Sequence, residues 1–451
     1  MVLSGRVGLI ALAGVLPILV SPWPEATFAA LLAVLLVAVV LDILLAAQPS
    51  AIGVTRTVAA SSRLGEPIDV SLSVRNDGSR RFRGQIRDAW APSACATPRA
   101  HDVTLSPGEH ISLLTRLDPV RRGDQRAAGI TVRALGPLRL AGRQRFRPLP
   151  DELRVLPPFL SRKHLPSRLA RLRQIDGAIP VLIRGQGTEF DSLREYVDGD
   201  DVRSIDWRAS ARRNDVVVRT WRPERDRRVV LVLDTGRTSA GRVGVDPIAA
   251  QRRTAAAGSG LEAGGWPRLD WSMDAALLLA ALAARAGDHV DFLAHDRETR
   301  AGVFNAGRTE LLSRLVDAMA PLEPSLIESD SAAMVSAVLR RTRGRALVVL
   351  LTDLNQSALE EGLLPVLPQL CARHQVIVAA VADPRVETLA AGRGDAAQVY
   401  DAAAAERSRI QRREVASRLR SMGVEVVDAP PEELAPALAD RYLAMKATGR
   451  L

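Results

Sequence analysis

The sequence is poor in aromatic residues and almost without lysine. Phe, Trp and Tyr make up 4% of the chain, and lysine occurs only at Lys163 and Lys446, so the formal net charge of +10 comes almost wholly from arginine. Such a bias partly reflects genome composition, and it therefore does not by itself indicate nucleic-acid binding. We expect no nucleic acid as a partner.

Cysteine is equally scarce. Cys95 and Cys371 lie far apart, in segments predicted to belong to different domains, which argues against a disulfide framework and fits a reducing compartment. The chain has no CxxC or HExxH spacing, and its six histidines do not cluster. A metal centre built from histidine or cysteine therefore has little support.

Signatures of catalysis and nucleotide binding are missing as well. No nucleophile with an adjacent base is identified, and neither a P-loop nor a dinucleotide fingerprint occurs. The pair of glycines at Gly185-Gln186-Gly187 follows no buried strand, so it is a weak signal. These absences favour a non-catalytic protein that acts through binding surfaces.

The chain of 451 residues is long enough for two or three domains. We predict a multi-domain protein with a transmembrane α-hairpin, a small antiparallel β-sandwich and a doubly wound α/β domain. The predicted boundaries are 1–50 for the hairpin, 51–157 for the β-sandwich, 158–228 for a linker with a charged segment, and 229–451 for the α/β domain.

Two apolar segments near the N-terminus predict the hairpin. Ala26–Ala47 is a run of 22 residues interrupted only by Thr27 and Asp42, which spans about 33 Å as a helix against about 30 Å for a hydrocarbon core. Val7–Val20 is shorter and reaches spanning length only if it extends to the Pro22–Pro24 turn. The second segment is thus the stronger candidate.

Arginines flank the hairpin on one side. Arg6 precedes the first segment, Arg56 and Arg63 follow the second, and the connector Ser21–Glu25 carries no positive charge. The positive-inside rule then predicts a multi-pass plasma-membrane protein with both termini and the soluble body in the cytoplasm. If the first segment is instead a cleaved signal peptide, the orientation is the same. We expect Asp42 to extend toward the interface rather than to relay protons.

Residues 51–157 show the period of two that is typical of half-buried strands. Ile68, Val70, Leu72 and Val74 alternate with polar residues, and turn sequences separate similar stretches. Residues 51–150 carry 17 arginines against 8 acidic residues. Beside a membrane this charge favours anionic lipid headgroups, and the alternative is a solvated basic surface without a partner.

Three continuous apolar runs in the C-terminal part predict buried parallel strands. They are Val229–Leu233, Ala346–Leu351 and Val376–Val381, and helical stretches lie between and after them. This alternation predicts the doubly wound α/β sheet. The Ala-, Gly- and Arg-rich segment Gly244–Gly265 fits neither pattern, and we interpret it as a long loop.

Asp234 and Asp353 directly follow two of these strands, at the edge where α/β sheets bind ligands. Carboxylates that converge with hydroxyls suit Mg²⁺ or Mn²⁺. The segment Asp234-Thr235-Gly236-Arg237-Thr238 resembles the D-x-S-x-S metal motif of von Willebrand factor A domains, with Asp353 as the later aspartate. The alternative role of both aspartates is to cap helices or turns.

The resemblance implies a metal site made of Asp234, Thr238 and Asp353. Gly236 replaces the first serine of the motif and removes one hydroxyl ligand, whereas Thr238 replaces the second. The separate loop threonine of that family has no secure match. Ser325, Glu328 and Asp330 lie in roughly the part of the sequence where that loop threonine would occur.

The most specific sequence signal is the charged run Gly185–Arg212. It resembles the signature E-F-x-x-L-R-x-Y-x-x-G-D-D-x-R-x-I-D-W-x-A-S-A-R of the domain of unknown function 58 family. The matching residues are Glu189, Phe190, Arg194, Tyr196, Gly199, Asp200, Asp201, Arg203, Asp206, Trp207, Ser210 and Arg212. Its dense charges predict an ion-pair network with aromatic anchors, which either docks the linker onto the α/β domain or contacts a partner.

The resemblance also implies an organisation and a role. Members of that family commonly have an N-terminal transmembrane pair, a β-rich segment and a von Willebrand factor A-like C-terminal part, and many are encoded beside MoxR-type AAA+ ATPases. The implied role is a membrane-bound adaptor for such an ATPase. The alternatives are a metal-dependent hydrolase using Asp234, Asp353 and Asp383, and a structural organiser of the cell envelope. The oligomeric state is not predicted.

Overall fold

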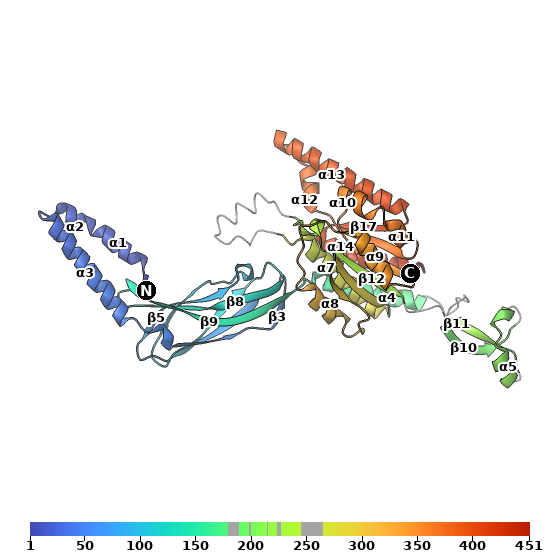
Figure 1. Cartoon of the computed structure of the whole chain (residues 1–451), viewed down its shortest axis with the longest axis horizontal. Helices are drawn as coiled ribbons and strands as arrows, with labels where there is room; N and C mark the ends of the chain where they lie inside the picture. Colours follow the sequence, from blue (N-terminus) through green and yellow to red (C-terminus); the bar gives the residue numbers. More distant parts are fainter. Residues whose placement is uncertain (179–188, 198–199, 214, 223–226, 245–264) are drawn as a thin grey trace. The chain divides into compact units, whose positions relative to one another are not determined.

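The computed structural model describes residues 1–178, 189–197, 200–213, 215–222, 227–244 and 265–451 (Figure 1). The described chain divides into two compact units, one formed by residues 1–156 and the other by the residues after 156. The predicted loop 244–265 lies outside the described residues except at its two ends.

The first unit begins with three apolar helices. Among the described residues, α3 (Pro24–Leu45) is the one helix that is long and apolar enough to cross a membrane. The shorter segment forms α1 (Gly5–Ala13) and α2 (Val15–Val20), which together span fewer residues than a typical membrane helix needs. One N-terminal apolar helix is thus confirmed, and the second membrane span stays a prediction.

The β-rich part of the first unit forms two sheets. One has the strand order β1-β9-β8-β5-β6, with β3 beside β9, and the other has the order β2-β4-β7. Pairing is antiparallel except that β3 runs parallel to β9, which the predicted all-antiparallel arrangement does not include. The strands are β1 (Val2–Leu3), β2 (Ile52–Thr57), β3 (Ser61–Arg63), β4 (Ile68–Asn76), β5 (Phe82–Trp90), β6 (His101–Leu105), β7 (His110–Leu117), β8 (Gly123–Leu135) and β9 (Ala141–Leu156).

The core of this unit follows the predicted alternation. Val70, Leu72 and Val74 of β4 are fully buried, and the polar residues between them are not. Leu72 and Val74 pack in one cluster with Phe82 and Ile130 from the other sheet. The inward-facing apolar side chains therefore join the two sheets.

The second unit contains a six-stranded sheet of order β14-β13-β12-β15-β16-β17, parallel except for β14. The three apolar runs form β12, β15 and β16 as predicted. The strands are β12 (Arg228–Asp234), β13 (His289–His295), β14 (Thr299–Val303), β15 (Ala346–Leu351), β16 (Gln375–Val381) and β17 (Glu425–Ala429).

Helices cover both faces of this sheet (Figure 1). Apolar residues of α9, α11 and α13 form one core with the sheet, while α7 and α14 pack against each other and on strands of the sheet. The helices are α4 (Leu165–Ala178), α7 (Arg268–Arg285), α8 (Leu311–Met319), α9 (Ser331–Arg341), α10 (Gln356–Ala358), α11 (Leu367–Cys371), α12 (Pro384–Ala390), α13 (Ala396–Ser421) and α14 (Pro431–Ala447).

The helical stretch after β15 is interrupted. It forms one wide turn at Leu359–Leu363 and then α11. Pro365 and Pro368 lie in this stretch, and proline lacks the N–H that a continuing helix needs.

The charged segment forms a small hairpin of its own. Strands β10 (Glu189–Glu195) and β11 (Val217–Arg222) pair antiparallel, and α5 (Trp207–Arg213) lies between them in the sequence. Phe190 pairs with Trp221 across the two strands, with a register shift before Ser192. The expected linker is therefore partly a folded element.

Candidate functional site

The carboxylate of Asp234, at the end of β12, is the centre of a polar cluster. The residue is 8% exposed. One oxygen, Oδ1, accepts hydrogen bonds from the Gly236 amide at 2.9 Å and the Ser329 hydroxyl at 2.5 Å. The other, Oδ2, accepts from the hydroxyls of Thr352 at 2.7 Å and Thr238 at 3.2 Å. Four donors from three segments of the chain thus fix this carboxylate.

Ser329 occupies the space that Gly236 leaves open. A Cβ atom at position 236 would lie 2.1 Å from the Ser329 hydroxyl oxygen, so a side chain there would displace it. Gly236 lacks the hydroxyl of the first serine in the D-x-S-x-S motif. Ser329, from a loop more than 90 residues later, places a hydroxyl beside Asp234 instead. Sequence spacing did not identify Ser329, because this loop has no periodicity that would align it.

The three loop residues that the sequence suggested have other roles. Ser325 donates to Asp296 Oδ2 at 3.2 Å, and Asp330 caps α9 by accepting from the Ala333 amide at 2.8 Å. Glu328 forms an ion pair with Arg237 at 3.6 Å, and these two side chains are 70% and 68% exposed. The Arg237–Glu328 pair therefore forms an exposed rim near the Asp234 cluster.

Asp353 follows β15 but is engaged by arginines. Its Oδ1 lies 2.7 Å from Arg412 Nη1 and 3.6 Å from Arg268 Nε. Arg412 also binds Asp428 at 2.8 Å. Burial opposes the charge on Arg412, but its hydrogen bonds to Asp428 and the nearby Asp353 carboxylate raise its pKa above the usual value. The negative charge of Asp353 is consequently balanced by arginines within the protein.

Asp383, the third carboxylate of the hydrolase hypothesis, is the N-cap of α12. It accepts hydrogen bonds from the amides of Arg385 and Gly244, both at 3.0 Å. Within the described ranges, no group of three or more Asp, Glu, His or Cys side chains is arranged to hold a metal ion. The N-cap position of Asp383 is the same kind of role, the capping of a helix or turn, that the sequence offers as the alternative for Asp234 and Asp353.

The oxygen atoms around Asp234 are of the type that binds Mg²⁺ or Mn²⁺. The groups that would hold such an ion are the Asp234 carboxylate and the hydroxyls of Thr238, Ser329 and Thr352. Asp353, by contrast, has its Oδ1 engaged by Arg412. The predicted set of Asp234, Thr238 and Asp353 therefore shares an edge of the sheet, but Asp353 is paired with arginines there.

Ion pairs organise the charged segment. Arg194 binds Asp200 at 2.6 Å, and Asp206 binds Arg219 at 2.8 Å. Asp206 also accepts from the Ala209 amide at 3.0 Å at the start of α5. This backbone hydrogen bond and the Arg219 guanidinium lower the pKa of Asp206. Arg219 lies outside the recognised signature, and sequence analysis did not identify it.

Other signature residues hold the turn or face solvent. Asp201 accepts from the Arg203 amide at 3.0 Å, and the Ser210 hydroxyl accepts from the Val217 amide at 2.9 Å. Trp207 is 67% exposed, so it is not the apolar anchor that we expected. The side chains of Glu189 and Phe190, and all of Gly199, lie outside the described residues, while Tyr196 is half-buried and Arg203 and Arg212 are exposed.

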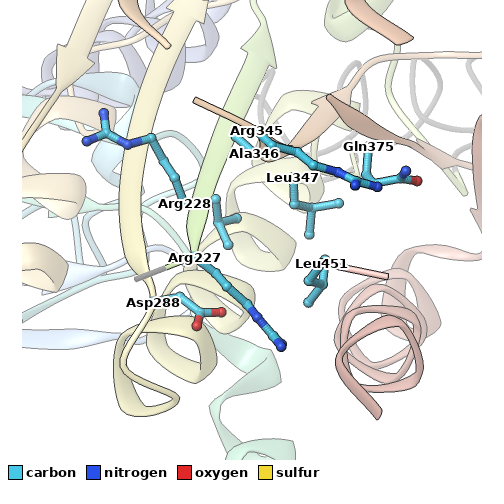
Figure 2. A pocket seen from close by; sticks show the side chains of 9 residues that line it. Arg227, Arg228, Asp288, Arg345, Ala346, Leu347, Gln375 and Leu451 are labelled. Atoms are coloured by element: carbon cyan, nitrogen blue, oxygen red, sulfur yellow. The ribbon is translucent and has the colours of Figure 1, made fainter. Parts of the chain in front are cut away.

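A pocket of about 190 Å³ lies at the opposite, amino edge of the sheet (Figure 2). It is lined by residues that include Arg227, Arg345 and Gln375. Asp288 also lines it and is held by Lys446 at 2.9 Å. Because Asp234 ends β12 whereas this pocket surrounds the start of β12, the two sites are separate.

Asp42 joins the apolar helix α3 to the β-rich part of the first unit. Its carboxylate is fully buried and accepts hydrogen bonds from the amides of Leu138 (2.7 Å), Leu140 (2.7 Å) and Ala141 (2.8 Å), in the turn between β8 and β9. The structure thus shows which backbone amides hold the Asp42 carboxylate, and the expectation that Asp42 extends toward the membrane interface stays a prediction. Its partners lie almost 100 residues away, where no local pattern shows them.

Two arginines complete this junction. Arg143 Nε donates to the carbonyl of Ile43 at 3.1 Å, and Arg80 Nη1 donates to that of Leu44 at 2.6 Å. Carbonyls in the last turn of a helix lack partners within the helix, and cations are favourable there. Near the start of α1, the Ser4 amide donates to the Leu140 carbonyl at 2.8 Å. The same turn thus binds both ends of the apolar segment.

The fold and these clusters define a multi-domain protein with an apolar N-terminal helix, mixed sheets and a polar site at the strand ends. The family model of "Protein of unknown function DUF58" matches residues 192–257 and 267–425. This part of the chain, which includes most of the charged segment and most of the α/β sheet, belongs to the DUF58 family.

Comparison with curated proteins gives no match. Solved structures that resemble the chain include Escherichia coli alpha-2-macroglobulin, with 13% identity over 23% of this chain and 7% of that one, at a TM-score of 0.19. The CARDB domain of the PF1109 protein from Pyrococcus furiosus has 13% identity over 25% of this chain and 94% of its own, at a TM-score of 0.18. The chain thus spans a small fraction of the macroglobulin, and similarity this low supports no functional argument.

Proposed function

We propose that the protein is a membrane-anchored, non-catalytic interaction module whose C-terminal unit recognises a MoxR-type AAA+ ATPase. The observation that carries the proposal is the Asp234 cluster, in which four donors hold one carboxylate at the strand ends. A fixed cluster with an exposed charged rim at Arg237 and Glu328 suits recognition of a partner surface. The choice of an ATPase rests on the family resemblance.

We further propose a von Willebrand factor A-like fold for the second unit and a two-helix membrane anchor for the first. The parallel sheet with Asp234 at the end of β12 supports the former. The latter is supported by the shared turn, since Leu140 binds Ser4 and Asp42 alike. Two membrane helices that start and end on one side of the bilayer leave the soluble body on that side. The arginines that flank the helices favour the cytoplasmic side.

Mg²⁺ or Mn²⁺ at Asp234 remains part of this proposal as an auxiliary ligand. The four oxygen-bearing residues around it support binding of the ion, and an open coordination position would accept a carboxylate of the partner. The pairing of Asp353 with Arg412 favours a protein that binds over one that hydrolyses, because it engages the second carboxylate of such a site with a guanidinium.

Co-purification tests the proposal. The full-length protein, extracted in detergent with and without Mg²⁺, is expected to retain a MoxR-type ATPase co-expressed from the same genome, and Asp234→Ala is expected to lose it. Asp317→Ala is the matched control, because Asp317 is exposed on α8. Equal retention of the ATPase by both variants would reject the strand-end face as the binding site.

A further inference from the structure

The end of α3 fixes the depth of the junction in the membrane. The helix Pro24–Leu45 has 22 residues and is about 33 Å long, close to the thickness of about 30 Å of a hydrocarbon core. If α3 spans the bilayer, as the proposed function requires, then Ile43 and Leu44 lie where acyl chains meet headgroups. The side chains that bind their carbonyls lie at the same depth.

Three arginines, Arg80, Arg139 and Arg143, are positioned at this end of α3, and we refer to them as the junction arginines. Arg80 and Arg143 each donate one hydrogen bond to a helix carbonyl, whereas a guanidinium has five N–H donors. Arg139 lies in the β8–β9 turn with a φ of 57° and is exposed. Its carbonyl accepts from the Ser4 hydroxyl at 2.6 Å, which fixes the turn against the start of α1.

Nearby carboxylates cancel only part of this charge. Asp42 is buried and its oxygens bind three backbone amides, so it faces the turn rather than the surface. Asp77, close to Arg80 in sequence, is paired with Arg75 at 2.6 Å. The junction therefore presents a surplus of positive charge.

Apolar side chains accompany the cations. Leu138, the residue before Arg139, is 53% exposed, and so is Leu45 at the end of α3. A surface that combines exposed leucines with guanidiniums at the depth of the headgroups matches a phospholipid, whose acyl chains are apolar and whose phosphate accepts several hydrogen bonds. A soluble anion would not account for the exposed leucines.

We propose that the junction arginines form a binding site for the phosphate of anionic phospholipids. Guanidinium groups bind phosphate through paired N–H donors, and the surplus charge selects anionic over zwitterionic headgroups. Bound lipid would hold the β-rich part of the first unit against the membrane surface, in the position that Asp42 and the two helix-capping arginines set.

Native mass spectrometry of the full-length protein released from nanodiscs tests this site. The nanodiscs contain equal amounts of phosphatidylglycerol and phosphatidylcholine. The wild type is expected to retain phosphatidylglycerol preferentially, and this preference should fall about fivefold in Arg139→Gln and further in Arg139→Gln/Arg143→Gln, because a basic residue near an anionic surface contributes about 1 kcal/mol. Arg126→Gln is the matched control, because Arg126 is exposed in the same unit and paired with Glu152.

An unchanged lipid preference in the double variant would overturn the proposal. An equal loss in Arg126→Gln would also overturn it, because net charge rather than a site would then determine the preference. Anchoring is measured separately by alkaline extraction of membranes. Release of the wild-type protein by alkali would reject the membrane anchor, whereas a retained protein without lipid preference would reject the lipid site alone.

Discussion

At the scale of single residues, the Asp234 cluster shows how far local sequence determines a site. An apolar run that ends in aspartate predicted that Asp234 lies at a strand end, and the nearby Thr238 hydroxyl was part of the same pattern. Ser329 reaches the cluster only because Gly236 leaves space for it. A partner that depends on loop conformation has no sequence signal of its own.

Asp274 leads to a prediction about pH. This side chain of α7 is buried, and burial raises its pKa to about 6, although hydrogen bonds from Ser161 favour the charged form. A carboxyl with a raised pKa contributes stability below its unfolded pKa of 3.8 and loses that contribution as the pH rises through about 6. The contribution of Asp274 to the free energy of unfolding should thus fall by up to about 3 kcal/mol between pH 4 and pH 7.

Urea denaturation of the full-length protein in detergent measures this effect. Asp274→Asn keeps the shape of the side chain but does not titrate, so the difference between wild type and variant isolates the contribution of Asp274. We expect the variant to gain stability relative to the wild type as the pH rises from 4 to 7. A difference that is independent of pH would contradict the raised pKa.

At the scale of elements, the junction of α3 with the β8–β9 turn depends on a glycine. A Cβ atom at Gly136 would lie 2.1 Å from Asp42 Oδ1 and 2.2 Å from the Asp42 carbonyl oxygen. Gly136→Ala should therefore separate Asp42 from its three amide donors and lower the stability of the first unit by about 1–3 kcal/mol, because buried polar groups lose their partners.

Thermal unfolding in detergent checks this expectation, with proteolysis of the first unit as the readout of unfolding. Gly8→Ala is the control, because no atom lies within 4 Å of the added Cβ and alanine favours the helix. A melting temperature of Gly136→Ala equal to that of the control would show that the turn tolerates a side chain and that the junction is looser than the hydrogen bonds indicate.

The same elements show which parts of the fold the sequence predicts. The strands β12, β15 and β16 are continuous apolar runs, and their burial on both faces makes them recognisable. The strand β13 contains the buried Asp291, which is bound by Arg228 at 2.9 Å and by the Asn305 amide at 3.1 Å, and β17 contains the polar residues Glu425 and Asp428. Strands whose charges are paired by distant residues are not identified by apolar periodicity.

At the scale of the whole molecule, the chain combines the part that matches the DUF58 family with the apolar helix α3, and its partner is the central proposal. The exposed Arg237–Glu328 pair offers a probe of the strand-end face that does not disturb the Asp234 cluster. Exchanging the two charges, with Arg237→Glu and Glu328→Arg together, preserves their mutual attraction but inverts the charges that a partner meets.

The most direct test is the affinity of the purified full-length protein in nanodiscs for the purified MoxR-type ATPase of the same organism. We predict saturable binding by the wild type and at least a tenfold weaker affinity for the charge-exchanged variant. Arg345→Glu, an exposed position at the amino edge of the sheet, should retain the wild-type affinity. Absence of wild-type binding, or equal affinity of the wild type and the charge-exchanged variant, would contradict recognition of the ATPase by the strand-end face.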